Sequence, residues 1–406
     1  MIAPSKSVDR PVVRLKPKSK PQALRHGFPW VFANELVTDR RTRNMDAGTI
    51  ALLEDSERRT LGVVAVTPES KIICRMLDRD PEAVIDQAWF EARIARALAM
   101  RERLYDAPFY RLIHAESDGL PGVVIDRFGD VAVIQPNAAW AEMRFEPLAA
   151  ALIEVTGVKS VVKNAAGRAR SLEGLDDVSG VTHGAVPDGP VPVMMNGATY
   201  LADVMGGQKT GLYFDQRLNH AFAASLSKGA RVLDVFSHVG GFSLAALAGG
   251  AASALAVDGS EAALELATKG AELGGFGDQF ATRKGDAFDV LTALAEEGAQ
   301  FDVVICDPPA FAPSKRAAEA GLRAYERIAR LAAPLVADGG YLGLCSCSHA
   351  VDLARFRNAS ARGIGRAIGS DGRRGQLIHT GFGGPDHPLL PQLAESGYLK
   401  ALFFRL

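Results

Sequence analysis

Two residues of this sequence stand where side chains could do chemistry, each directly after a short apolar run. Asp307 follows FDVVIC (301–306) and precedes two prolines, which fix the backbone and point its carboxylate beyond the run. Cys347 follows YLGLC (341–345) and lies between two serines. A rigid carboxylate can hold a planar heterocycle by its hydrogen-bonding edge. A thiolate can add to a ring carbon and make the neighbouring carbon nucleophilic. The alternative for Cys347 is a small buried filler, the usual place of a free cysteine.

Residues 230–258 predict the unit that positions these side chains: a strand, a glycine turn, a helix and a second strand. Such units build parallel sheets whose ligands lie at the carboxyl ends of the strands. Gly240 and Gly241 let a ligand lie against bare backbone, and Asp258 can accept hydrogen bonds from both hydroxyls of a ribose. The turn is not G-x-G-x-x-G, which disfavours NAD and FAD. A cofactor with a ribose and no phosphate is favoured, above all S-adenosylmethionine; a unit without a ligand is the alternative.

Other motifs flank this unit and leave alternatives open. Asp286 follows an expected third strand, where it either meets an adenine amino group or caps a helix from Val290. A charged cluster just before the unit forms either a lid over the cofactor or a solvated helix start. Its members are Lys209, Asp215 and Arg217. The run DPPAF (307–311) favours methyl transfer to a nucleobase or an amide nitrogen and does not say which atom accepts the methyl group.

Composition limits the class of protein. The chain has 406 residues, of which 48% are hydrophobic and 23% charged, as in a globular protein of two or three domains. No apolar run approaches the ~20 residues that cross a bilayer, and none follows the N-terminal lysines, so we expect neither a membrane span nor a secretory signal. Four cysteines are too few for a disulfide framework and fit the reducing cytoplasm. Cys345 and Cys347 have no second Cys or His pair at ligand spacing, so no metal site is expected.

The pattern along the chain predicts three domains. Residues 1–80 form a small β domain, 81–190 an α+β middle domain, and 191–406 an α/β Rossmann-like domain whose final strand is reversed. The net charge is −1, yet the first 43 residues carry ten basic residues against three acidic ones, which fits a phosphate-facing surface or a solvated tail equally well. Trp30 either stacks on RNA bases or, as we favour, fills the small β domain. Arg170 is expected in a polar loop, either solvated or touching a phosphate.

The C-terminal half resembles the class I S-adenosylmethionine-dependent methyltransferases that modify carbon-5 of a cytosine in large-subunit (23S) ribosomal RNA, the type with an N-terminal PUA domain. The phrases that carry the resemblance are GQKTGLYFDQR (207–217), VLDVFSHVGGFSLAAL (232–247), FDVVICDPPAFAPSK (301–315), GGYLGLCSCS (339–348) and DHPLLPQLAESGYLKALFFRL (386–406). DGLPGVVIDRFGD (118–130) is similar to the family's middle region, and GFPWVF (27–32) to a phrase of its PUA domain. The resemblance spans almost the whole chain.

This resemblance implies a role for each candidate residue. Cys347 would be the nucleophile and Asp307 the anchor of the base, so these two are the expected catalytic residues. The expected cofactor-binding residues are Asp215, Arg217, Asp234, Phe236, Ser237, Gly240, Gly241, Asp258, Ser260, Asp286, Ala287 and Asp307. The expected substrate-binding residues are Lys209, Pro308, Phe311, Trp30 and Arg25. S-adenosylmethionine is the expected cofactor.

Three functions remain open at this stage. The first is cytosine-5 methylation through a covalent Cys347 adduct. The second keeps the cofactor but methylates a nitrogen, for example of guanine, and needs no cysteine. The third is an RNA-binding protein without turnover. Ribosomal RNA is the expected partner and no membrane is involved. The expected location is the cytoplasm, and a homodimer is considered for the oligomeric state.

Overall fold

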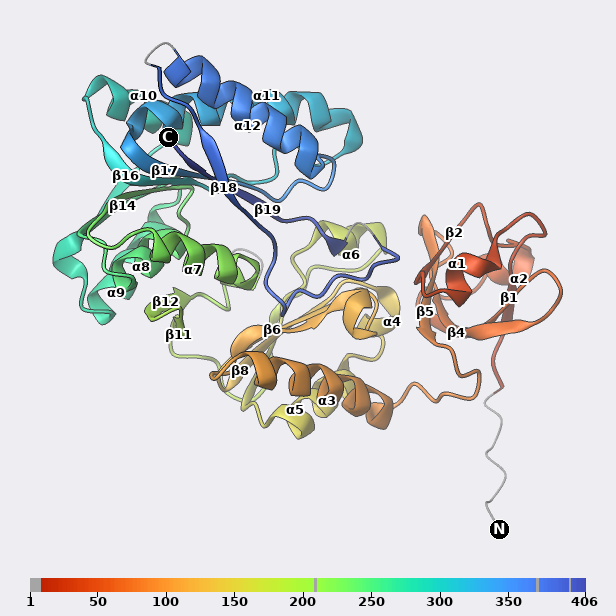
Figure 1. The fold of residues 1–406 in the computed structure, drawn as a ribbon. Coiled ribbons are helices and arrows are strands. Elements are labelled where there is room, and N and C mark those ends of the chain that lie inside the picture. The colour runs from red at the N-terminus through yellow and green to blue at the C-terminus, as the bar shows by residue number, and fades with distance from the viewer. Residues whose placement is uncertain (1–8, 208–209, 370–371, 394–395) are drawn as a thin grey trace. The chain divides into compact units, whose positions relative to one another are not determined.

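The computed structural model describes residues 9–207, 210–369, 372–393 and 396–406 (Figure 1). The chain divides into two compact units. The first holds Met1–Asp188, Val204–Thr210 and Pro388–Ser396, and the second holds Gly189–Asp203, Gly211–His387 and Gly397–Leu406. The described residues contain no helix that is long and apolar enough to span a membrane.

The first unit begins with a small β structure. Its five-stranded sheet has the order β1-β3-β4-β5-β2, with β1 Val12–Arg14, β2 Trp30–Phe32, β3 Thr49–Glu54, β4 Thr60–Val66 and β5 Ile72–Asp78. The short helices α1 Pro21–Arg25 and α2 Arg40–Arg43 lie between its strands along the chain. Alternate residues such as Val13, Leu53 and Val64 fill its core, as the two-residue period of a strand requires.

A second sheet of this unit has the order β10-β9-β8-β7-β6. Its strands are β6 Phe109–His114, β7 Val123–Phe128, β8 Val131–Pro136, β9 Ser160–Lys163 and β10 Gly180–His183. The accompanying helices are α3 Gln87–Leu104, α4 Ala139–Glu142, α5 Phe145–Thr156 and α6 Arg168–Leu172, with the 3-10 turn η1 Ala115–Asp118. Helix α3 begins at Gln87, because the Asp86 side chain accepts the backbone N–H of Trp89 and caps the helix there.

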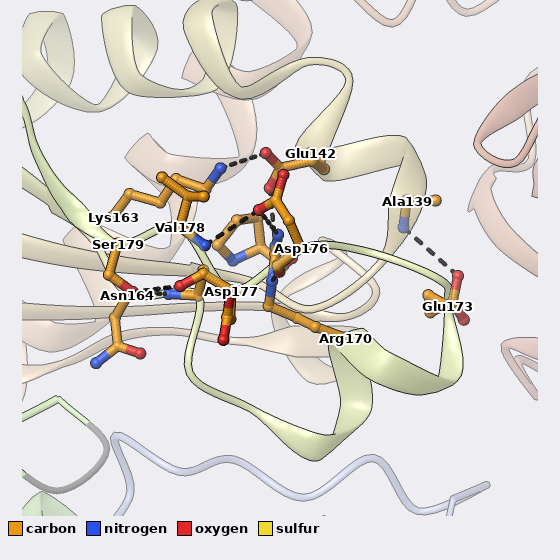
Figure 2. A network of polar contacts seen from close by, with 12 residues as sticks. Ala139, Glu142, Lys163, Asn164, Arg170, Glu173, Asp176, Asp177, Val178 and Ser179 are labelled. Atoms are coloured by element: carbon orange, nitrogen blue, oxygen red, sulfur yellow. Dashed lines mark hydrogen bonds and ion pairs between the residues drawn. The ribbon is translucent and has the colours of Figure 1, made fainter.

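Arg170 corrects one expectation about this part of the chain. It lies on α6 and is almost fully buried, so it is not a solvated loop residue. Figure 2 shows its guanidinium turned toward Glu142 and Asp176: Nη1 donates to Glu142 at 2.8 Å, and Nε donates to the Asp176 carbonyl at 2.9 Å. Lys163 also pairs with Glu142. Since its polar atoms are used within the fold, Arg170 ties α6 to α4 rather than contacting a phosphate.

The second unit contains a seven-stranded sheet of order β15-β14-β13-β16-β17-β19-β18. Its strands are β13 Arg231–Val235, β14 Ser253–Asp258, β15 Phe280–Lys284, β16 Phe301–Cys306, β17 Val336–Ser346, β18 Gln376–Gly381 and β19 Lys400–Arg405. The first five are parallel, and β19 runs antiparallel to β17, as the expected reversed final strand does. A hairpin of β11 Val191–Met195 and β12 Ala198–Ala202 precedes the sheet and turns at Asn196-Gly197.

Helices cover both faces of this sheet (Figure 1). One face carries α7 Arg217–Ser225, α8 Gly241–Ala248 and α9 Glu261–Leu273, and the other carries α10 Ala287–Glu296, α11 Ala318–Ala332 and α12 Leu353–Ile368. The described part of the unit also holds the 3-10 turns η2 Phe214–Gln216, η3 Gly277–Gln279, η4 Lys315–Ala317 and η5 Ala333–Leu335. Because it is covered on both faces, the central strand β16 is mostly apolar, with Val303, Val304, Ile305 and Cys306 fully buried.

Candidate active site

The candidate residues of the second unit gather where its central strands end. In the parallel register Val235 lies opposite Val257 on one side and Cys306 on the other, and Cys306 lies opposite Leu344 of β17. The residues that follow these strands therefore share one edge of the sheet, where ligands of open α/β sheets bind. The turn after β13, Asp258, Asp307 and Cys347 all belong to this edge.

The turn after β13 is tightly constrained. Phe236 and His238 have positive φ angles of 64° and 49°, which are uncommon for residues with a Cβ. Asp258 holds the turn from the neighbouring strand: one carboxylate oxygen accepts the backbone N–H of His238 at 2.9 Å, and the other accepts that of Ser260 at 2.8 Å. Half-buried, this carboxylate keeps lone pairs for a further partner.

The two glycines of the turn have packing reasons of their own. Gly240 has a φ of 82° and precedes α8, a left-handed conformation that glycine adopts without strain. A Cβ on Gly241 would lie 2.8 Å from Nε2 of His220. His220 is buried between Tyr200 and Phe242, and burial lowers its pKa to about 3, so the imidazole is neutral. Gly240 thus allows the turn into α8, and Gly241 lets α8 pack closely against α7.

Asp234, just before this turn, has a hydrogen-bond partner for only one of its two carboxylate oxygens in the described part of the chain. It is fully buried, and Oδ2 accepts the backbone N–H of Ser243 at 2.9 Å. Burial raises its pKa from 3.8 to about 6. Within the described part of the chain, Oδ1 of Asp234 and the hydroxyl of Ser237 are buried without a hydrogen-bond partner. Buried polar atoms are almost always paired, so two unpaired ones beside a strained turn fit a polar ligand that would satisfy them.

Two candidate residues near the edge, an aspartate and a serine, serve as helix caps. The exposed Asp286 accepts the backbone N–H groups of Phe288 at 2.9 Å and Asp289 at 3.3 Å through Oδ1, so α10 begins at Ala287, three residues earlier than expected. Ser260 caps α9 in the same way, its hydroxyl accepting from Ala263 at 3.3 Å. Ala287 is buried in the first turn of α10.

Asp307 is held by its own backbone and by a buried amide. Its N–H donates to the carbonyl of Val235 at 3.1 Å, and its Oδ2 accepts from Nε2 of Gln216 at 2.9 Å. The other end of the Gln216 amide accepts from Nδ2 of Asn219 at 2.6 Å. The following Pro308 is buried. The carboxylate is therefore fixed in one orientation from two directions.

Phe311, at the end of the same run, belongs to an aromatic cluster. Its ring centroid lies 5.0 Å from that of Tyr325, 6.1 Å from Phe288 and 6.4 Å from Phe236. The cluster joins the run after β16 to the turn after β13 and to the start of α10. Phe311 is half-buried, so it combines this packing with an accessible edge.

Cys347 is the least buried thiol of the chain. Cys74, Cys306 and Cys345 are fully buried, and burial raises the pKa of each of these three thiols. Cys347 lies one residue beyond β17 and is half-buried. Cys345 and Cys347 are two residues apart, a spacing that places side chains on the same face of a strand. Because β17 ends between them, Cys345 belongs to the core and Cys347 to the edge.

The loop that carries Cys347 is fixed on both sides of the residue. The hydroxyl of Tyr325 lies 2.9 Å from that of Ser346 and 2.7 Å from that of Ser348. Nζ of the buried Lys400 donates to the carbonyls of Ser348 at 2.8 Å and Val351 at 2.7 Å. Because these contacts are satisfied within the fold, the thiol is presented from a rigid loop.

The phenol of Tyr213 lies close to several acidic groups of this edge. Burial raises the pKa of its phenol to about 12, and four neighbouring acidic groups contribute to the rise. These groups are Asp215, Asp307, Cys347 and Asp258. The Tyr213 ring also packs edge-on against His238, with centroids 5.1 Å apart. Tyr213 is thus a protonated phenol close to the turn after β13 and to the two expected catalytic residues, Asp307 and Cys347.

Asp215 and Arg217 lie beside this tyrosine and are buried. Oδ2 of Asp215 accepts from the hydroxyl of Tyr398 at 2.6 Å, which joins η2 to the segment before β19. The Arg217 carbonyl accepts from Asn196 at 2.8 Å, and its guanidinium carbon lies 5.6 Å from the centre of the Phe214 ring. A solvated helix start does not describe these residues.

Comparison with known proteins places the chain in a family. Residues 182–366 match the family model of S-adenosylmethionine-dependent methyltransferases, and residues 13–79 match that of PUA-like domains. Ribosomal RNA large subunit methyltransferase I of Alteromonas mediterranea is 37% identical, over 95% of this chain and 96% of its own length. Its namesake from Shewanella denitrificans is 35% identical, over 97% and 99%. The chain belongs to the ribosomal RNA large subunit methyltransferase I family.

A solved structure shows the same fold. A SAM-dependent methyltransferase from Streptococcus mutans has a TM-score of 0.80 at 18% identity, covering 98% of this chain and 100% of that one. The expected Rossmann-like methyltransferase fold with a PUA-like N-terminal domain is therefore confirmed. Membership of this family also confirms S-adenosylmethionine as the cofactor.

Three expected substrate-binding residues are not among the described residues of the second unit. Lys209 lies outside the described residues. Arg25 and Trp30 belong to the first unit, where each already has a partner. Arg25 donates to Asp55 at 2.7 Å, and Nε1 of Trp30 donates to Glu116 at 2.8 Å. Trp30 is half-buried against Phe28 and Phe32, so it both packs and keeps an accessible part.

Sequence reasoning missed several residues that shape the site. Gln216 and Tyr213 belong to the phrase GQKTGLYFDQR (207–217), from which only the charged residues were chosen as candidates. Lys400 and Tyr325 act from a distant strand and helix, so no spacing in the sequence connects them to Cys347. The family phrase around Asp215 was the one available signal for Gln216.

Proposed function

We propose that this protein transfers a methyl group from S-adenosylmethionine to carbon-5 of a cytosine in large-subunit ribosomal RNA. The names of its relatives support large-subunit ribosomal RNA as the substrate. The choice of carbon-5 rests on one observation: Cys347 is the thiol that is not buried, and it stands on a rigid loop at the same edge as Asp307. A nitrogen acceptor would need no thiol there.

The residues around the turn after β13 fit the cofactor. The unpaired Oδ1 of Asp234 and hydroxyl of Ser237 offer hydrogen bonds to its polar groups, and the carboxylate of Asp258 suits the ribose hydroxyls. Asp286 and Phe288 would contact the adenine ring. The remaining candidates for cofactor contacts are Asp215, Arg217, Phe236, Gly240, Gly241, Ser260 and Ala287. The bound cofactor supplies an electrophilic methyl group on sulfur.

The proposed reaction assigns the addition to carbon-6 and the anchoring of the cytosine to residues of this edge. The Cys347 thiolate adds to carbon-6 of cytosine, and the electron pair of the 5,6 double bond moves to carbon-5. Carbon-5 takes the methyl group from S-adenosylmethionine, leaving S-adenosylhomocysteine. A proton acceptor then removes the carbon-5 proton, and that electron pair re-forms the 5,6 double bond and expels the thiolate. Asp307 hydrogen-bonds the ring-nitrogen side of the base throughout. Tyr213 stays protonated, because its pKa is raised to about 12, and would serve as a hydrogen-bond donor during the reaction.

Other parts of the chain would bring the RNA to this edge. We assign RNA binding to a PUA-like domain over 1–80, with Arg25 and Trp30, followed by a middle domain over 81–190 and the methyltransferase domain over 191–406. Lys209, Pro308 and Phe311 would contact the nucleotide near the site. The cytoplasm, where free thiols stay reduced, would be the site of the reaction. A measurement of the protein's mass in solution would test whether it is a homodimer.

The test is incorporation of labelled methyl from S-adenosylmethionine into ribosomal RNA, followed by nucleoside identification. We expect 5-methylcytosine from the intact protein and none from Cys347→Ala. Cys345→Ala is the matched control, because it removes a buried thiol two residues away. A methylated guanine, or unchanged methylation by Cys347→Ala, would give the nitrogen mechanism instead. Cofactor binding with no methyl transfer to any RNA would leave a binding protein.

A further inference from the structure

Helix α11, which follows the run after β16, carries a line of arginines on the side that faces solvent. Buried residues such as Leu322, Tyr325 and Ala329 line one side of the helix. Arg323, Arg327 and Arg330 lie on the opposite side, and Arg316 continues the line into η4 with the same helical phase. All four side chains are exposed. We call Arg316, Arg323, Arg327 and Arg330 the arginine ridge; Arg316 and Arg330 are about 20 Å apart at 1.5 Å per residue.

The neighbouring acids are already paired with other arginines. Helix α12 lies beside α11 on the same face of the sheet (Figure 1), and its arginines cross to the two glutamates of α11. Arg355 pairs with Glu319, and Arg362 and Arg366 both pair with Glu326. No described carboxylate pairs with the ridge. Lys315–Ala332 and Leu353–Ile368 together hold nine basic residues and two acidic ones, in a chain whose net charge is −1.

The ridge is connected to the active-site edge through packed rings. The guanidinium carbon of Arg327 lies 4.5 Å from the centre of the Phe288 ring, and Phe288 contacts Phe311. Phe311 ends the run that begins with Asp307, and Arg316 follows it by five residues. A polyanion lying along the ridge would therefore reach the site where the nucleotide is expected.

We propose that the arginine ridge binds the phosphate backbone of the RNA substrate on the methyltransferase domain itself. This inference rests on the proposed function and adds a second RNA contact to the one expected from the PUA-like domain. Arginine suits phosphate because its planar guanidinium donates two parallel hydrogen bonds and is always charged. The paired arginines of α12 hold the two helices together and leave the ridge to the ligand. Such contacts position RNA without selecting sequence.

The experiment compares two triple variants in binding to large-subunit ribosomal RNA transcribed in vitro, over a series of salt concentrations. The ridge variant is Arg316→Gln with Arg323→Gln and Arg330→Gln; Arg327 is left because it packs on Phe288. We expect the dissociation constant at moderate salt to rise on the order of tenfold or more. The slope of log affinity against log salt should fall by about 2, since each lost phosphate contact removes about 0.7 from it.

The matched control removes three exposed arginines outside α11 and α12: Arg96→Gln with Arg103→Gln and Arg374→Gln. It should bind RNA nearly as the intact protein does, and S-adenosylhomocysteine should bind all three proteins equally. Equal weakening of RNA binding by both variants would mean that only total charge matters, which overturns the ridge. Unchanged RNA affinity in the ridge variant overturns it too. If that variant then fails only on assembled large subunits, the ridge contacts a protein. No RNA binding by the intact protein would instead refute the proposed function.

Discussion

The side-chain amide of Gln216 donates a hydrogen bond to the carboxylate of Asp307, with Nε2 2.9 Å from Oδ2. Gln216 is almost fully buried, and its amide oxygen accepts from Asn219 at 2.6 Å, so it cannot rotate without breaking two hydrogen bonds. The contact fixes which way the Asp307 carboxylate faces. Orientation of a group that holds the substrate can contribute several kcal/mol to a reaction. Gln216 is therefore a positioning residue for Asp307.

Replacement of Gln216 by leucine tests this role. The change keeps the approximate volume but removes the donor to Asp307 and the acceptor for Asn219. We expect kcat for methyl transfer to fall roughly 10- to 100-fold, the equivalent of about 1–3 kcal/mol. Affinity for S-adenosylhomocysteine, measured by calorimetry, should change little. Gln279→Leu, at an exposed glutamine of the same unit, is the control. A parallel loss of kcat and cofactor affinity would mean that Gln216 only supports the fold.

Two acids at neighbouring strand ends should differ in their effect on the cofactor. The Asp258 carboxylate uses one oxygen for His238 and the other for Ser260, so Asp258→Asn removes an acceptor that the turn needs. We expect its affinity for S-adenosylhomocysteine to fall roughly 10- to 100-fold. Asp286→Asn keeps the cap of α10, because asparagine caps helices as well as aspartate does, and should cost less. Calorimetric titration of both variants checks the order. Equal losses would contradict it.

The sheet and the location of the site could be predicted from local patterns. Apolar runs that end in an acid or a thiol mark strand ends, and strand ends of a parallel sheet share an edge, so Asp258, Asp307 and Cys347 were expected together. Asp286 shows the limit of such reasoning. An acid at that position fits both adenine contact and helix capping, and only the backbone geometry shows that α10 begins directly after it.

Contacts between distant segments could not be predicted at all. Gln216 and Asp307 are 91 residues apart, and a glutamine contributes no periodic signal that would connect them. The expectation for Arg170 was wrong for a related reason. The polar residues around it suggested a loop, while its partner Glu142 lies 28 residues earlier in the chain. Buried ion pairs and buried amides are tertiary features, so they become visible once the segments are packed.

Asp234 predicts a dependence of stability on pH. Its pKa is raised from 3.8 to about 6 in the folded state, so the folded protein binds a proton there more tightly than the unfolded chain does. The ionised carboxylate therefore destabilises the fold above pH 6, by up to about 3 kcal/mol, and this cost disappears as the pH falls toward 4. Asp234→Asn should raise the melting temperature of the cofactor-free protein at pH 8 and leave it nearly unchanged at pH 4.

The same change should weaken the cofactor site, since an amide presents a donor or an acceptor where the carboxylate presents two acceptors. Thermal unfolding at both pH values, with and without S-adenosylhomocysteine, separates the two effects. Asp278→Asn, at an exposed carboxylate of the same unit, should shift neither melting temperature appreciably. A stabilisation of equal size at pH 8 and pH 4 would show that charge burial at Asp234 is not its cause.

Lys400 should control the rate of methyl transfer through the loop that carries Cys347. Its buried ammonium donates to the carbonyls of Ser348 and Val351, and Lys400→Met keeps the aliphatic stem while removing both hydrogen bonds. Two buried carbonyls would lose their donor, which costs about 1–3 kcal/mol of stability for each group left unpaired. We expect kcat to fall roughly 10- to 100-fold, because a loop displaced by about 1 Å misplaces the thiol. Affinity for S-adenosylhomocysteine should persist, since the cofactor turn lies on other strands. Lys228→Met, at an exposed lysine, is the control, and full activity of Lys400→Met in the folded protein would show that the loop keeps its conformation without this anchor.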